Sequence, residues 1–331
     1  MATTAHEGEL QPWAALDGPV SHQLRRSLAC LAHTDVFVRG FSEARQLVGW
    51  LHAAFGPHGC TGGSPDVVDT CTRRLTPPGQ AFPPSHLHRN LSRCREDHYA
   101  ATPYTSYCSE HDVTLSFEWK SFQFTPHDES FHARVRAAAA ASPERRVIAI
   151  LSGGPHHFSK FKDHKHAMYF SLPDSFAIPQ HWLQDFAAST DQLFRTFGTQ
   201  TLPSNACVLW KTSNVGPRLG DGKGERPRTR HHPSARNGFH EWLNRWTTVM
   251  ARGAHLPVLD LTDLTAHVVP RPNPKLVADG KVAPLAATDG HSHATEAAVE
   301  GDYYHGFNAT LLLQPFVART CQLCAHRAKV L

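Results

Sequence analysis

The stretch TDVFVRGFSEARQLVGWL, residues 34–51, predicts a buried strand that runs directly into a helix. The β-branched and aromatic run at 36–38 favours a strand with both faces covered. Gly40 then permits a sharp turn, and Ser42 lies where a helix would begin. Apolar residues within 47–51 follow with the spacing of one helical face. The stretch therefore indicates a strand–turn–helix unit with a serine at its turn.

Ser42 has two interpretations at this stage. A serine at the carboxyl end of a first strand, at a helix N-terminus, can act as a nucleophile, and backbone amides there can hold an oxyanion. An ordinary N-cap serine gives the same pattern. The stretch alone leaves both interpretations open.

Composition excludes several classes of protein. The chain has 331 residues, of which 40% are hydrophobic and 19% charged, and this indicates a globular protein with a substantial core. A net charge of +4 is too small to argue for nucleic acid as a partner. No apolar run approaches the 18 residues of a membrane span, and residues 1–18 contain no apolar core of a secretion signal. A Walker loop and a GxGxxG motif are both absent from the sequence, so we expect no nucleotide cofactor.

Histidines and cysteines raise the question of metal binding. The chain has 25 histidines, and the densest group, His156, His157, Asp163, His164 and His166, fits no metal motif. Its one CxxC, at 321–324, has no second CxxC to complete a zinc ribbon. We therefore expect no metal site.

The eight cysteines bear instead on disulfides and on the compartment. Four of them crowd into residues 60–108, where disulfides would add rigidity. The even count and two glycosylation sequons, at Asn90 and Asn308, favour the secretory pathway, Golgi or extracellular. The N-terminal sequence argues against it, so the compartment stays open.

Strand patterns alternate with helix patterns along the rest of the chain. Further strands are expected at 111–120, 146–154, 206–212 and 256–261, and helices at 23–32, 131–142, 182–197, 239–252 and 308–321. Residues 56–101 are rich in Pro, Gly, His and Cys, which indicates a long ordered loop or insertion.

Together these patterns predict a doubly wound α/β fold, a three-layer sandwich around a central parallel sheet of about five strands. We expect an N-terminal approach segment (1–33), one α/β domain (34–322) with an insertion at 56–105, and a C-terminal tail (323–331). Ligands of such sheets lie outside the carboxyl ends of the strands.

A second candidate for chemistry lies before the last expected helix. Asp302 and His305 stand three residues apart, so a carboxylate could orient an imidazole that reaches a serine from elsewhere. A turn capped by Asp302 with an exposed His305 would give the same letters.

The layout as a whole resembles the SGNH/GDSL esterase superfamily, and within it the PC-esterase branch, which includes plant-type polysaccharide O-acetyltransferases. The resemblance spans roughly residues 34–322 in short blocks. These blocks are Gly40-Phe41-Ser42 with Arg45, VTLSFEW at 113–119, SGGPHHF at 152–158, KTSN at 211–214, and Asp302 and His305 followed by Asn308, Leu311 and Leu312.

The resemblance implies a serine esterase or O-acyltransferase acting on acyl esters of carbohydrate, chiefly acetyl, with no metal and no cofactor. Ser42 would be the nucleophile, His305 its base and Asp302 the residue that orients His305. The oxyanion would be held by the Ser42 amide, Gly154, and Asn214 or His156. An alternative base is offered by Asp289 and His291 in the segment DGHSH.

Two departures from the family pattern favour a different function. Phe41 replaces the acidic residue of Gly-Asp-Ser, and His156 stands where the superfamily has an asparagine. A catalytically inactive member that binds glycans or a partner protein would tolerate both. A generic α/β-hydrolase fits less well, because its nucleophile lies mid-chain after several strands.

Overall fold

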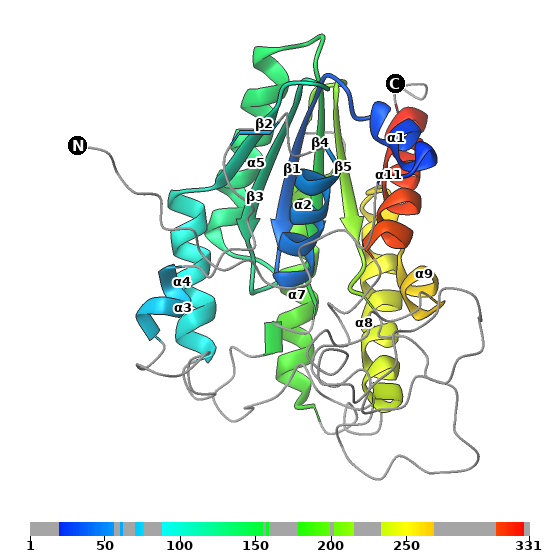
Figure 1. Cartoon of the computed structure of the whole chain (residues 1–331). Helices are drawn as coiled ribbons and strands as arrows, with labels where there is room; N and C mark the ends of the chain where they lie inside the picture. The colour runs from blue at the N-terminus through cyan, green and yellow to red at the C-terminus, as the bar shows by residue number, and fades with distance from the viewer. Residues whose placement is uncertain are drawn as a thin grey trace.

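The computed structural model describes residues 20–55, 60–61, 70–75, 88–154, 157–158, 178–198, 202–214, 233–267 and 309–327. Its centre is a mixed sheet with the order β2-β3-β1-β4-β5-β6 (Figure 1). The strands are β1 (Thr34–Gly40), β2 (Tyr104–Cys108), β3 (Val113–Trp119), β4 (Arg146–Ser152), β5 (Ala206–Lys211) and β6 (Val258–Leu259).

Five of these strands are parallel, and only β2 runs antiparallel, along the outer edge of β3. Counted in chain order, the parallel strands follow the order 2-1-3-4-5 of a doubly wound sheet. The predicted fold class and its five parallel strands are confirmed. The antiparallel edge strand β2 was not predicted.

Helices cover both faces of the sheet. They are α1 (His22–Ala29), α2 (Ser42–Ala54), α3 (Thr70–Leu75), α4 (His88–Ala101), α5 (Pro126–Ala141), α7 (Gln180–Thr196), α8 (Pro233–Gly253), α9 (Thr262–His267) and α11 (Ala309–Arg327). Along β4, Ile148 and Ile150 pack with α1, α2 and α11, whereas Val147 and Ala149 pack on the opposite face with α5, α7 and α8. Burial on both faces explains why the central strands are continuous apolar runs.

The prediction for residues 56–101 is wrong in part, because α3 and α4 lie within it. Helix α4 is mostly polar and shows no clear apolar stripe, so periodicity alone does not reveal it. It is held instead by Tyr99, which packs edge-on against Phe117 of β3, and by the buried carboxylate of Glu96. Helix α5 starts five residues before its predicted position, where Asp128 accepts a hydrogen bond from the Thr125 N–H at 2.8 Å.

Arg39 of β1 is fully buried and lies at the centre of a charged cluster. Its guanidinium donates to Asp128 at 2.9 Å and to Glu118 and Glu96 at 3.2 Å each. Lys120 Nζ contacts both oxygens of Asp128 at 2.7 Å. Burial raises the pKa of Asp128, but the charges of Lys120 and Arg39 outweigh it and hold that pKa below its ordinary value. Ionised Asp128 therefore stabilises the fold at neutral pH, and this stabilisation is lost as the pH falls through its folded-state pKa.

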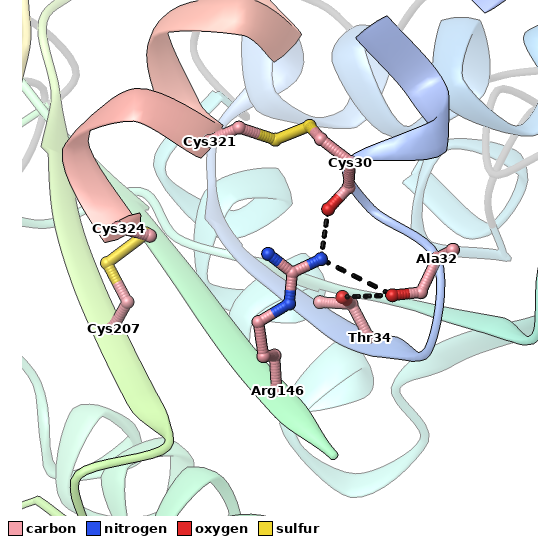
Figure 2. The surroundings of a disulfide bond; sticks show 7 residues. All are labelled: Cys30, Ala32, Thr34, Arg146, Cys207, Cys321 and Cys324. Atoms are coloured by element: carbon pink, nitrogen blue, oxygen red, sulfur yellow. Dashed lines mark hydrogen bonds between the residues drawn. A yellow bond between two sulfur atoms is a disulfide. The ribbon is translucent and has the colours of Figure 1, made fainter. Parts of the chain in front are cut away.

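Four disulfides join the cysteines: Cys30–Cys321, Cys60–Cys108, Cys71–Cys94 and Cys207–Cys324. The four cysteines of the 60–108 region pair with one another, a pairing that the sequence left open. The two CxxC cysteines of α11 each pair with a distant partner, so they link α11 to the segment after α1 and to β5 (Figure 2). Four disulfides are consistent with an oxidising compartment. Within the described residues, no helix is long and apolar enough to cross a membrane.

Arg146 adds a polar link beside the first of these disulfides. Its guanidinium donates to the carbonyl of Cys30 and to that of Ala32, as Figure 2 shows. The amino end of β4, the segment after α1 and the carboxyl half of α11 are thus joined at the amino edge of the sheet.

The long-range disulfide should contribute more stability than the short-range one. Cys30–Cys321 closes a separation of 291 residues and Cys71–Cys94 one of 23. Because loop-closure entropy grows with loop length, Cys30→Ala/Cys321→Ala should lose about 2 kcal/mol more unfolding free energy than Cys71→Ala/Cys94→Ala. Guanidinium denaturation of the two double variants measures this, and equal losses would contradict the entropic account.

Candidate active site

The carboxyl ends of β1 and β4 lie side by side at the middle of the sheet. In the sheet, β1 has β3 as its neighbour on one side and β4 on the other. After β1 the next parallel strand is β3, and after β3 the chain crosses back over β1 to β4, so the direction in which strands are added reverses there. Such a reversal of strand order is where doubly wound sheets bind ligands. Ser42 is the first residue of α2, directly after β1, and therefore lies at this point.

Ser42 does not cap its own helix. Phe41 is the N-cap residue, and its carbonyl accepts hydrogen bonds from the amides of Ala44 at 2.9 Å and Arg45 at 3.1 Å. Ser42 is half-buried and occupies the first helical position. The N-cap interpretation is therefore wrong, and the hydroxyl is available for another task. The amides of Ser42 and Glu43 belong to the first turn, where no intrahelical acceptor exists.

A buried ion pair lies beneath this first turn. Glu43 Oε2 is 3.2 Å from Lys211 Nζ and accepts a hydrogen bond from the Asn214 N–H at 2.8 Å. Lys211 Nζ also donates to Asn214 Oδ1 at 3.1 Å. Burial lowers the pKa of Lys211, and the Glu43 carboxylate opposes that change. Asn214 is thus tied to the residue next to Ser42.

Glycines allow the backbones to approach one another at this edge. A Cβ on Gly40 would overlap Ser152 Oγ and lie 2.5 Å from the Cβ of Ala44, so glycine lets α2 begin against the end of β4. Gly154 has φ +148°, a conformation that side chains disfavour, and its Cβ would lie 2.8 Å from Ser213 Oγ. Ser213 Oγ in turn donates to the Gly153 carbonyl at 3.1 Å.

His157 is a buried residue whose place in the sequence suggested only a metal ligand. Its buried imidazole accepts a hydrogen bond at Nδ1 from the Gln123 N–H at 3.0 Å and donates from Nε2 to Asp185 at 2.7 Å. Its backbone N–H donates to the Gly154 carbonyl at 3.0 Å. Both ring nitrogens are occupied by these contacts, and His157 thereby joins three segments. Nothing in the sequence indicated that His157 is buried.

Of the predicted site residues, Ser42, Gly154 and Asn214 come together at one edge of the sheet. His156, Asp302, His305, Asp289 and His291 lie outside the described residues. No group of three or more potential metal ligands occurs in the part of the chain that the structure describes.

Comparisons with known protein families, with curated proteins and with solved structures find no match to this chain. The family resemblance therefore rests on the short sequence blocks alone.

The glycine turn after β4 can be tested against a matched glycine. Gly154→Ala should lower the unfolding free energy by about 2 kcal/mol, because it strains the backbone and crowds Ser213. Gly253→Ala is the control, since a Cβ there meets nothing within 4 Å. Urea denaturation compares the two. Equal stabilities would contradict the conformation at Gly154.

The ion pair beneath Ser42 should show strong coupling. Glu43→Gln leaves Lys211 charged and buried without a carboxylate, which should cost about 3 kcal/mol of unfolding free energy. Adding Lys211→Met should restore most of that loss, as a double-mutant cycle would report. The exposed pair Asp191–Arg195 of α7 is the control, where Asp191→Asn should have little effect. Additive losses at Glu43 and Lys211 would contradict the pairing.

Proposed function

We propose that the protein is an SGNH-type serine esterase or O-acyltransferase that acts on acyl esters of carbohydrate, acetyl esters in particular. The observation that carries the proposal is the place of Ser42, at the first position of α2 and at the strand-order reversal between β1 and β4. This position lies at the edge of the sheet where doubly wound folds bind ligands.

In the proposed mechanism, Ser42 Oγ attacks the acyl carbon and His305 takes its proton, with Asp302 orienting the imidazole. The Ser42 amide at the N-terminus of α2 is suited to hold the oxyanion, because the helix dipole also favours negative charge there. Gly154 and either Asn214 or His156 complete that role. The ester C–O bond then breaks as His305 gives its proton to the departing alcohol oxygen, and the acyl group passes from Ser42 to water or to a sugar hydroxyl.

Phe41 is the residue that raises doubt about catalysis, since it replaces an acidic residue of the family pattern. Its side chain is 4% exposed and packs in the core cluster beneath α2. Its carbonyl accepts the first two hydrogen bonds of the helix. The turn is thus held by backbone and apolar contacts and needs no acidic side chain. This supports an active enzyme over an inactive binding module.

The direction of α11 also supports the proposal. Cys324 near its carboxyl end is joined to Cys207, the second residue of β5, so this end lies at the amino edge of the sheet. The helix extends from there toward the carboxyl edge, where Ser42 lies (Figure 1). The family pattern requires Asp302 and His305 to act from the segment before such a helix. The disulfides further support a protein of the secretory pathway, Golgi or extracellular.

The purified protein should hydrolyse p-nitrophenyl acetate and react with a fluorophosphonate at Ser42. Ser42→Ala and His305→Ala should each lower kcat by about a thousandfold or more, because either change removes the activated nucleophile. Ser27→Ala on α1 is the control and should keep wild-type activity. Full activity in Ser42→Ala would refute the assignment. A wild type that neither turns over the ester nor reacts with the probe would favour the glycan- or protein-binding module.

A further inference from the structure

Gln123 carries an unusual buried side chain. It lies in the loop between β3 and α5 and is 0% exposed, yet neither Nε2 nor Oε1 has a hydrogen-bond partner among the described residues. Buried amides in folded proteins are almost always paired, because an unpaired one keeps the full penalty of lost hydration. The presence of an unpaired amide at this buried position therefore needs an explanation.

The amide lies against the proposed site. Gln123 Oε1 is 2.5 Å from the point where a Cβ of Gly153 would be, and Trp210 Cη2 is 3.2 Å from that point. Any larger residue at 153 would displace the amide. Ser152 Oγ is also fully buried and without a hydrogen-bond partner among the described residues, and it lies beside Gly40 at the start of α2. Unpaired polar atoms therefore occur on both sides of Gly153, at the strand-order reversal.

The loop that carries Gln123 is held in place from behind. Its N–H donates to His157 Nδ1, and His157 is fixed in turn by Asp185 of α7 and by the Gly154 carbonyl. A polar group whose backbone is anchored in this way can meet a ligand with little loss of conformational freedom.

We propose that the Gln123 amide is a substrate-binding group that pairs with two adjacent free hydroxyls of the sugar that carries the ester. The inference rests on the proposed function. The amide offers a donor and an acceptor side by side. A carboxylate would satisfy only its donor and an ammonium only its acceptor, whereas neighbouring hydroxyls satisfy both. Gln123 would thus select carbohydrate esters over simple ones.

The first test compares stability without any ligand. Gln123→Leu replaces the amide by an apolar group of similar size and should raise the melting temperature by about 2 °C, because it removes an unpaired buried amide. Thr320→Val is the matched control. Thr320 is 2% exposed and its hydroxyl is unpaired among the described residues, but it lies beside Cys321 at the amino edge. A lower melting temperature for Gln123→Leu would show that the amide serves the fold and would overturn the inference.

The second test compares three esters: a monoacetylated methyl glycoside with free ring hydroxyls, the fully acetylated glycoside, and p-nitrophenyl acetate. The wild type should prefer the monoacetylated glycoside. Gln123→Leu should lower its kcat/KM by tenfold or more relative to that of p-nitrophenyl acetate, because the hydroxyls lose their partner. Thr320→Val should keep the wild-type ratios. Unchanged ratios in Gln123→Leu, with p-nitrophenyl acetate still hydrolysed, would overturn the inference alone.

A wild type that hydrolyses none of the esters would contradict the proposed function, and binding then decides the inference. Titration of the monoacetylated glycoside, followed by tryptophan fluorescence, should give a dissociation constant at least tenfold higher for Gln123→Leu than for the wild type. Equal affinities, or no binding by the wild type, would overturn it.

Discussion

The fold depends on the neutralisation of one buried charge. The side chain of Arg39, on the central strand β1, is fully buried. An unpaired guanidinium at this position would strongly destabilise the folded state. Its partners come from three other elements, Glu118 from β3, Glu96 from α4 and Asp128 from α5. Displacing any of these elements would remove a carboxylate from the buried guanidinium. The cluster therefore fixes how the elements dock around β1.

This constraint reaches the candidate site through the backbone. Lys120, which shares Asp128 with Arg39, donates its N–H to the carbonyl of Gly40 at 2.8 Å. Gly40 is the residue that lets α2 begin against Ser152 of β4. The charged cluster lies on the α5 side of the sheet and the serine turn on the α2 side. Lys120 and Gly40 connect the two. A second buried ion pair, Glu43 with Lys211, supports the turn from the β5 side.

The sequence predicts the fold well because burial on both faces gives β4 and β5 continuous apolar runs, at 147–151 and 206–210. It fails at α4, whose attachment includes Glu96, the Tyr99–Phe117 ring contact and Arg95 over the Trp119 ring, and leaves no apolar stripe. Ser42, Gly154 and Asn214 could be placed at one edge because each follows a strand. The role of His157 could not, because it depends on contacts with Gln123 and Asp185 that only the tertiary structure creates.

Features that stabilise the fold lie at the amino edge of the sheet, and features that destabilise it lie at the carboxyl edge. Two disulfides and the Arg146 contacts join α11, β4 and β5 at the amino edge. At the carboxyl edge, Gly154 adopts a conformation that side chains disfavour, and the buried polar atoms of Gln123 and Ser152 stay unpaired among the described residues. Local rules of stability are expected to fail where a chain is shaped for a ligand and not for its own packing. The covalent links of the amino edge offset these costs. The turn at Phe41 and Ser42 fits the same division, because Phe41 is buried in the core and its carbonyl accepts the first two hydrogen bonds of α2.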